Sequence, residues 1–400
     1  MSNTTAQAAL DGLIGAERIA ALNDTLGKAK GLPGAAYGPD FYRLEQTDFF
    51  PRLWCPVAFA SDLPDPGDAY PVDLAGWKIL LLRDKTGELR AFHNVCRHRA
   101  MQPVPSPCKG LSHITCAWHA WTYGLDGKLV ATPTIGGERE NASPDFDKAD
   151  TDLRPIRIAQ WFDLIFVNID GQAPPFDEHI APLADLVSEF DHTKLARAED
   201  WSTVYPANWK VTVESVLEEY HIPFGHPQLT RGVRRHNPML HGAGRTFMAT
   251  SNDREYTDRA KADSAMGMPG IFPPIPSTDP NGTTPNRSHF IVVSPTGAMQ
   301  TRSDHMLLGL MLPNGPDSTN VRFVHYYVGD AATDPALAPV RDKLVEAWKV
   351  VFAQDVDFVR NTQANHALRD EVGLDTRFSP YWESNLRQFQ QMVVEVIRGD

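Results

Sequence analysis

The chain has 400 residues, of which 42% are hydrophobic and 22% are charged, so it can bury an ordinary core divided between two or three domains. Its formal net charge of −12 argues against a general nucleic-acid surface, which would carry a basic field. No run of about 18 uncharged apolar residues occurs, and the first residues lack the basic and apolar segments of a secretory signal. We therefore expect a cytoplasmic protein that binds neither nucleic acid nor membrane.

The cysteine content points to metal chemistry. Only four cysteines occur, Cys55, Cys96, Cys108 and Cys116, which is too few for a disulfide scaffold in a chain of this length. Cys55 lies in the apolar run LWCPVAF, which is typical of a buried small hydrophobic residue. Cys108 has no evident partner.

Two regions with different patterns follow one another along the chain. From about residue 40 to 165, short β-rich runs such as WKILLLRD and LRAFHNV alternate with turn signals such as DPGD and LDGK, which predicts a compact antiparallel domain. Beyond it, strand-like runs such as HFIVVSP and HMLLGLML are interleaved with helical patterns near residues 210–221 and 336–366. This mixture predicts an antiparallel sheet covered by helices, and an α+β protein as a whole.

The segment 264–287 interrupts the second region. It is rich in proline and glycine and is not expected to form a regular element. We expect a long loop, either a lid or pocket wall or, as the commoner case, a plain surface excursion.

Two short chelating arms lie within the β-rich region. Cys96 and His98 form a CxH arm, and after 17 residues Cys116 and His119 form a CxxH arm. Thiolates and imidazoles together bind either a tetrahedral zinc or an iron–sulfur cluster in which histidine replaces cysteine on one iron. An extended CxH arm and a tight CxxH turn would each give one sulfur and one nitrogen, which favours the cluster. A zinc ribbon and unliganded core residues are the alternatives.

The segment VTVESVLEEYHIPFGHP predicts an amphipathic helix. Glu214, Glu218 and His221 would then share one stripe of its surface. Pro223 is expected to end the helix, which lets His226 return toward His221. A histidine pair of this kind is more often structural than a metal site.

A carboxylate far along the sequence favours a metal site over a purely structural histidine pair. The segment PVRDKLVEAWKVVFAQDVDFVRNTQ predicts a long helix, in which Asp355 falls inside the apolar stripe and Asp357 faces elsewhere. A buried carboxylate costs several kcal/mol unless it is paired, protonated or bound to a metal. His221, His226 and Asp355 match the facial triad that leaves open positions on iron(II). A buried salt bridge from Asp355 is the alternative.

Together these motifs resemble the catalytic α subunits of Rieske-type non-haem iron oxygenases, the ring-hydroxylating oxygenase family. CRHRA and CAWHAWTYGLDGKL resemble the Rieske domain, NWK followed by E-x-Y-H-x4-H resembles the catalytic domain, and QDVDFVRNTQ resembles its acidic ligand motif. The resemblance spans roughly residues 40–400 and implies a [2Fe–2S] cluster and a mononuclear Fe(II). The implied ligands are Cys96, His98, Cys116 and His119 for the cluster, and His221, His226 and Asp355 for the single iron. Three aromatic residues would pack around the cluster: Trp118, Trp121 and Tyr123.

The resemblance also implies a domain plan. A helical segment at 1–40 would pack on the catalytic domain, followed by a β-rich Rieske domain at 41–165 and a catalytic mononuclear iron domain at 166–400. Family members are head-to-tail trimers in which an acid bridges ligand histidines of neighbouring subunits. By position that acid is Glu218, whereas Glu219 would point about 100° away on a helix.

The activity implied is that of a terminal oxygenase component that uses O2. No strand-linked G-x-G-x-x-G fingerprint is apparent, so NAD(P)H would be oxidised by a separate flavin and iron–sulfur reductase, with or without a ferredoxin. Glu218 stands where ring dioxygenases often carry Asp, and Ser215 stands where Asn is common. The glutamate at the bridging position and a chain of about this length resemble oxygenases of quaternary ammonium compounds such as carnitine, which favours monooxygenation or N-demethylation. Hydroxylation or dihydroxylation of an aromatic compound is the alternative. A Rieske electron carrier without oxygenase activity and a structural zinc protein are alternatives of other classes.

Two further residue sets bear on ligands. A quaternary ammonium ion would bind among aromatic faces, for which Phe224 and Phe272 are candidates. The basic stretch TRGVRRHNP contains Arg231, Arg234 and Arg235. It could dock an acidic electron donor or meet an anionic substrate, although a solvated surface patch is the commoner case.

Overall fold

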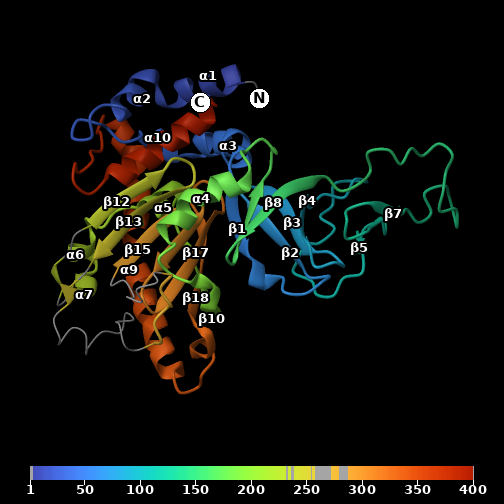
Figure 1. Cartoon of the computed structure of the whole chain (residues 1–400). Helices are drawn as coiled ribbons and strands as arrows, with labels where there is room; N and C mark the ends of the chain where they lie inside the picture. The colour runs from blue at the N-terminus through green and yellow to red at the C-terminus, as the bar shows by residue number, and fades with distance from the viewer. Residues whose placement is uncertain are drawn as a thin grey trace. The chain divides into compact units, whose positions relative to one another are not determined.

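The computed structural model describes residues 3–230, 233–235, 238–253, 255–256, 272–278 and 287–399. The chain forms two compact units (Figure 1), a small unit of Phe50–Ala173 and a large unit of Met1–Phe49 with Pro174–Asp400. The strands are antiparallel and the helices belong mainly to the large unit, so the predicted α+β class is confirmed. No helix within the described ranges is long and apolar enough to span a bilayer.

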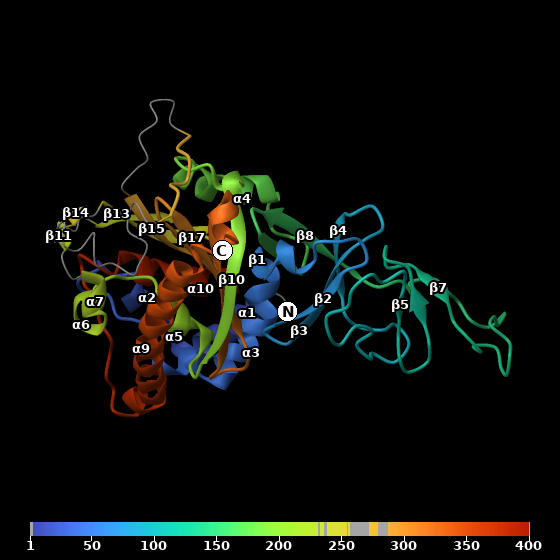
Figure 2. The same ribbon diagram turned by 90° about the horizontal axis from the view of Figure 1, so that it is seen from below.

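The small unit contains two antiparallel sheets (Figure 2). The larger sheet has the order β1-β9-β8-β4-β3-β2, with bounds Cys55–Phe59, Leu164–Asn168, Pro155–Trp161, Leu89–His93, Trp77–Arg83 and Ala69–Leu74. The smaller sheet has the order β5-β6-β7, with bounds Ile114–Thr115, Thr122–Tyr123 and Leu129–Ala131. The runs WKILLLRD and LRAFHNV, which predicted strands, form β3 and β4.

The small unit is not bounded at residues 41 and 165 as expected. Helix α3, Pro39–Asp48, belongs to the large unit, because its Glu45 pairs with Lys210 there. Strand β9 pairs with both β1 and β8, so the small unit extends to Ala173.

The large unit is built on a seven-stranded antiparallel sheet in the order β10-β18-β17-β16-β15-β13-β12. In that order the bounds are Leu195–Tyr205, Thr319–Val328, His305–Pro313, Gly297–Thr301, Arg287–Val293, Phe247–Asp253 and Pro238–Ala243. A separate pair consists of β11, Val233–Arg235, and β14, Glu255–Tyr256. Strand β17 is buried along almost its whole length, so both faces of the sheet are covered.

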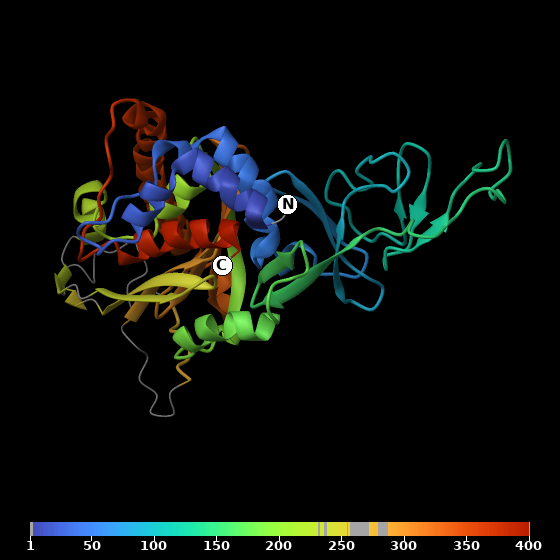
Figure 3. The same cartoon turned by 90° about the horizontal axis from the view of Figure 1, so that it is seen from above.

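Helices cover this sheet. The predicted long helix is α9, Ala338–Glu371, which packs on the sheet through Trp348 and Phe352. Helix α10, Ser384–Arg398, contacts β12 and β13, and also the N-terminal helices α1 and α2 (Figure 3). Within the described residues, the large unit also contains the helices α1 (Asn3–Ile14), α2 (Ala16–Leu22), α3, α4 (Phe176–Leu186), α5 (Trp209–Glu214), α6 (Ile222–Gly225) and α7 (Pro227–Thr230).

The helix predicted over residues 210–221 is much shorter than expected. Helix α5 ends at Glu214, where Ser215 Oγ donates to the Thr212 carbonyl. Further along, the Glu218 carboxylate accepts the backbone N–H groups of Tyr220 and His221. Glu214 turns into the core, where it accepts a hydrogen bond of 2.7 Å from Tyr37 Oη. Burial raises the pKa of Glu214 to about 6. The predicted stripe joining Glu214 to the histidines is therefore wrong.

The NWK segment fixes the start of α5. Asn208 caps the helix, since its Oδ1 accepts the Lys210 N–H at 3.0 Å. Lys210 and Glu45 are fully buried, with Nζ and Oε1 2.5 Å apart, and Trp209 Nε1 donates to the same carboxylate. Burial raises the pKa of Glu45 and lowers that of Lys210. This signature segment thus holds the scaffold beneath the site.

Candidate metal centres

The two chelating arms of the small unit form nearly equivalent loops. In each loop the cysteine N–H donates to a carbonyl five residues later, from Cys96 to Met101 at 2.8 Å and from Cys116 to Trp121 at 2.9 Å. The fourth residue after each cysteine is an alanine with positive φ, 60° in one loop and 55° in the other. The CxH arm is therefore a turn like its partner, and the extended backbone expected for it is wrong.

The loops bury their sulfurs and expose their imidazoles. Cys96 and Cys116 are each 2% exposed and belong to the core of the small unit. His98 and His119 are exposed, and their ring centroids lie 4.4 Å apart. Burial, then the neighbouring His119 and an arginine, lower the pKa of His98. Two buried thiols and two outward imidazoles suit a cluster with one iron on each side.

A single zinc ion fits this arrangement less well. A tetrahedral zinc site gathers all its ligand atoms around one point. Across the part of the chain that the structure describes, such a gathering within 4.8 Å occurs only in another group, in the large unit. Separated sulfur and nitrogen pairs are what a two-iron cluster needs.

Tyr123 has a closer relation to this site than packing. Its Oη lies 3.3 Å from Cys96 Sγ and accepts the Arg97 N–H at 3.0 Å. Either atom can donate in the contact with the sulfur, and when Cys96 is a thiolate the hydroxyl is the donor. Burial and the Cys96 contact raise the pKa of Tyr123, so the proton is retained. Hydrogen bonds to the sulfurs are among the factors that set the reduction potential of an iron–sulfur cluster. Residue type alone did not distinguish this tyrosine from the aromatic residues expected to pack around the site.

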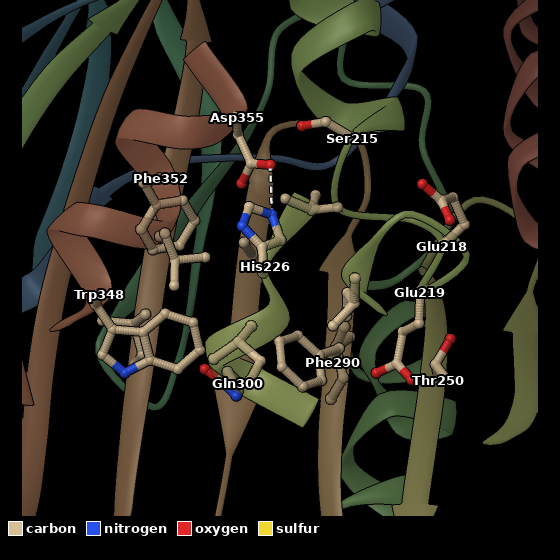
Figure 4. A pocket seen from close by; sticks show the side chains of 18 of the residues that line it. Ser215, Glu218, Glu219, His226, Thr250, Phe290, Gln300, Trp348, Phe352 and Asp355 are labelled. Carbon is tan, nitrogen blue, oxygen red and sulfur yellow. Dashed lines mark hydrogen bonds and ion pairs between the residues drawn. The ribbon is translucent and has the colours of Figure 1, made fainter. Parts of the chain in front are cut away.

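In the large unit, His221, His226 and Asp355 converge. One ligand atom from each lies within 4.8 Å of the other two. The Nε2 atoms of His226 and His221 lie 2.9 Å and 3.7 Å from Asp355 Oδ1, and Figure 4 marks the shorter contact with a dashed line. His226 is 1% exposed and Asp355 is 4% exposed. Two imidazoles and one carboxylate are the donor set of a mononuclear Fe(II) site.

Both histidine rings are oriented through Nδ1. His221 Nδ1 lies 2.5 Å from Glu218 Oε1, and His226 Nδ1 lies 2.8 Å from Gln354 Oε1. Since each acceptor requires a proton on Nδ1, both Nε2 atoms are left to bind a metal. Burial lowers the pKa of His226, but its contacts with Asp355 outweigh that effect and raise it.

The other acidic residues near the triad have different places. Glu219 is 4% exposed, accepts a hydrogen bond of 2.7 Å from Asn252 Nδ2, and lines a pocket beside the triad. It is not directed away as a helix would have placed it. Asp357 pairs with Arg360 on the exposed side of α9, as the helical pattern predicted.

The pocket has a volume of about 720 Å³ including its open mouth. One wall is the sheet and the other is α9, and the triad lies between them with Glu218 and Ser215 (Figure 4). Its lining is mostly apolar, with four aromatic side chains: Phe290, Phe323, Trp348 and Phe352.

The aromatic residues proposed earlier for an ammonium ion are not in this lining. Phe224 is 80% exposed. Phe272 is buried, and its ring centroid lies 4.5 Å from that of Tyr327. Most of the predicted loop 264–287 lies outside the described residues, as do the side chains of Arg231, Arg234 and Arg235.

Comparisons with known proteins match both parts of the chain. The model of the ring-hydroxylating alpha subunit catalytic domain matches residues 192–399, and the Rieske [2Fe–2S] domain model matches residues 53–142. The glycine betaine monooxygenase oxygenase subunit of Chromohalobacter salexigens is 31% identical over 228 residues, covering 56% of this chain and 50% of that protein. The carnitine monooxygenase oxygenase subunit of Escherichia coli K12 is 33% identical over 202 residues, covering 50% and 53%.

The fold is shared with a solved oxygenase. A quaternary ammonium Rieske monooxygenase in complex with γ-butyrobetaine superposes with a TM-score of 0.74 at 22% identity, covering 94% of this chain and 98% of that chain. This likeness concerns the fold alone. The chain matches about half the length of the curated relatives.

Proposed function

Because the chain belongs to the family of ring-hydroxylating oxygenase alpha subunits, we propose that it is a terminal oxygenase component that oxidises a small quaternary ammonium or betaine-like compound with O2. Membership confirms the resemblance predicted from the motifs. The observation that carries the proposal is the convergence of His221, His226 and Asp355 beside a pocket, in a chain that also has a Rieske domain.

The metal cofactors proposed are a [2Fe–2S] cluster and a mononuclear Fe(II). Iron held by the triad would supply O2 activation, and a cluster held by the two loops would supply electrons. The proposed cluster ligands are Cys96, His98, Cys116 and His119. The buried sulfurs and the exposed imidazoles support the cluster ligands, and the convergence of His221, His226 and Asp355 supports the single iron.

The chain's own residues prepare the site. Glu218 and Gln354 hold the two triad imidazoles in the tautomer that binds a metal. The apolar walls from the sheet and α9 limit water around the substrate and confine it beside the triad. Glu218 is also proposed to accept a hydrogen bond from His119 of a neighbouring subunit, which would join the two metal centres of a homotrimer.

The partner proposed is a reductase, because no strand-linked G-x-G-x-x-G nucleotide motif is apparent in this sequence. Electrons from NAD(P)H would arrive through a separate flavin and iron–sulfur reductase, with or without a ferredoxin. The proposal places this system in the cytoplasm.

The substrate class is supported by the relatives named for glycine betaine and carnitine and by glutamate at the bridging position. Monooxygenation or N-demethylation is therefore proposed. The four aromatic side chains of the pocket favour one second candidate, hydroxylation or dihydroxylation of an aromatic compound.

Metal analysis tests the proposal first. Anaerobically purified protein should contain about three irons and two acid-labile sulfides per chain. With a reductase and NADH, it should then consume O2 when glycine betaine or carnitine is added. Zinc without sulfide would contradict the oxygenase. Correct iron and sulfide with O2 consumption only on aromatic compounds would move the substrate to the second candidate.

A further inference from the structure

One polar side chain stands out on the sheet wall of the pocket. Strand register places Thr250, Phe290, Gln300 and Leu307 opposite one another on β13, β15, β16 and β17. All four line the pocket (Figure 4 labels the first three). Gln300 is 6% exposed, so its amide is buried in a largely apolar wall. A buried amide of this kind costs free energy unless its groups find partners.

Arg302 fixes the direction of this amide. It follows Gln300 by two residues, and its guanidinium lies over the Trp348 ring, 6.0 Å from the centroid. With the Gln300 amide turned so that its polar atoms face suitable partners, its oxygen accepts from Arg302 Nη2 at 3.1 Å and from Nε at 3.2 Å. The opposite orientation would turn the amide NH2 toward guanidinium N–H groups, which are donors only. The oxygen is therefore held by Arg302, and the NH2 group, which has two N–H donors, is directed to the side of the amide that faces acceptors.

This arrangement suits an anionic acceptor. A guanidinium behind the amide oxygen draws electron density from the amide and makes its N–H groups better donors. Among the described residues that line the pocket, the ionisable groups other than histidine are the carboxyl groups of Glu218, Glu219 and Asp355, all acceptors when ionised. Gln300 thus offers the donor that a substrate carboxylate needs.

We propose that Gln300, oriented by Arg302, is a specificity-determining residue that donates a hydrogen bond to a carboxylate of the substrate. The inference rests on the proposed function only in that the pocket is taken as the substrate site. It predicts that the substrate carries a carboxylate whether its other end is an ammonium group or an aromatic ring.

Two matched pairs of compounds separate these questions. Glycine betaine and choline share a trimethylammonium group, but glycine betaine carries a carboxylate where choline carries a hydroxymethyl group. Benzoate and benzyl alcohol differ in the same way on an aromatic ring. Dissociation constants are measured by titration calorimetry on the anaerobic holoprotein, so the readout does not depend on turnover.

In the wild-type protein, the carboxylate member of at least one pair should bind roughly 10- to 100-fold more tightly than its hydroxymethyl partner, the range for a hydrogen bond to a charged group. Gln300→Met removes the donor at similar size and should abolish that preference. Gln300→Glu keeps a partner for Arg302 but presents no donor, and should abolish it too. Circular dichroism and the visible spectrum of the cluster check that each variant is folded, and the second variant serves if the first is not.

Gln172→Met is the matched control, because it makes the same substitution at an exposed glutamine that is not among the residues lining the pocket. It should retain the carboxylate preference. A preference that survives both Gln300 variants, or no preference in the wild type, would overturn the inference. Preference within the aromatic pair alone would support Gln300 while contradicting the ammonium substrate, and absence of binding to all four compounds would overturn both proposals.

Discussion

The Glu218 carboxylate holds the His221 imidazole, with Oε1 and Nδ1 2.5 Å apart. The same carboxylate accepts the backbone N–H groups of Tyr220 and His221, so it closes a turn rather than continuing a helix. A residue that ties the ring to the turn that carries it is well placed to orient a metal ligand.

Glu218→Gln should therefore abolish substrate-coupled turnover while both metal centres stay occupied. The amide can still accept a hydrogen bond from Nδ1, but it no longer carries the charge that the proposed link to His119 of a neighbouring subunit needs. Iron and sulfide per chain and substrate-dependent O2 uptake are measured together. Asp357→Asn, at an exposed acid of α9, is the control and should behave as wild type. Activity that survives with full iron would rule out the bridging role.

Tyr123→Phe should lower the reduction potential of the cluster. Removing a hydrogen bond to Cys96 Sγ removes stabilisation of the reduced, more negative cluster; a bond worth about 1 kcal/mol corresponds to roughly 40 mV for one electron. Spectroelectrochemical titration of the purified protein measures the shift. Tyr70→Phe, at a tyrosine of β2 outside the two loops, is the control. An unchanged potential would mean that the hydroxyl contact does not act on the cluster.

Lys210→Met should destabilise the large unit by about 3–5 kcal/mol, because it leaves the Glu45 carboxylate buried without its cation. Combining Lys210→Met with Glu45→Gln should recover much of that loss, since the amide still accepts from Trp209 Nε1. Urea unfolding of the single and double variants measures the free energies. Lys349→Met breaks the exposed pair with Glu346 and should change stability by less than about 1 kcal/mol. Equal losses in the single and double variants would contradict the buried pair's role.

The metal ligands could be predicted because their residue types and short spacings carry the chemistry directly. Asp355 stood out as a carboxylate inside an apolar helical stripe, and the structure places it among the buried residues of α9. These patterns are local, so they can be recognised without any knowledge of the fold.

Other features depend on competition between side-chain and helical hydrogen bonds, or on pairing between strands that are far apart in the sequence. Helical spacing continued past Ser215, yet side-chain hydrogen bonds from Ser215 and Glu218 replace the helix there. The relation of Gln300 to Phe290 and Trp348 depends on strand register and on the packing of α9 against the sheet. Neither the end of helix α5 nor the register of these strands can be read from the local residue pattern.

Acid should destabilise the protein through His325, which is fully buried in β18. Burial, then the neighbouring His305 and Lys349, lower its pKa to about 3. The unfolded chain binds a proton near pH 6.5, so the free energy of unfolding is unaffected above that pH and falls as pH drops from about 6.5 toward 3, by about 2 kcal/mol at pH 5.

Urea unfolding of the wild type and His325→Gln at pH 7 and pH 5 isolates this contribution, because the other titrating groups are common to both. The variant should lose about 2 kcal/mol less than the wild type between the two pH values, whereas His113→Gln, at an exposed histidine, should lose as much as the wild type. The same loss in all three proteins would show that His325 does not carry the pH dependence.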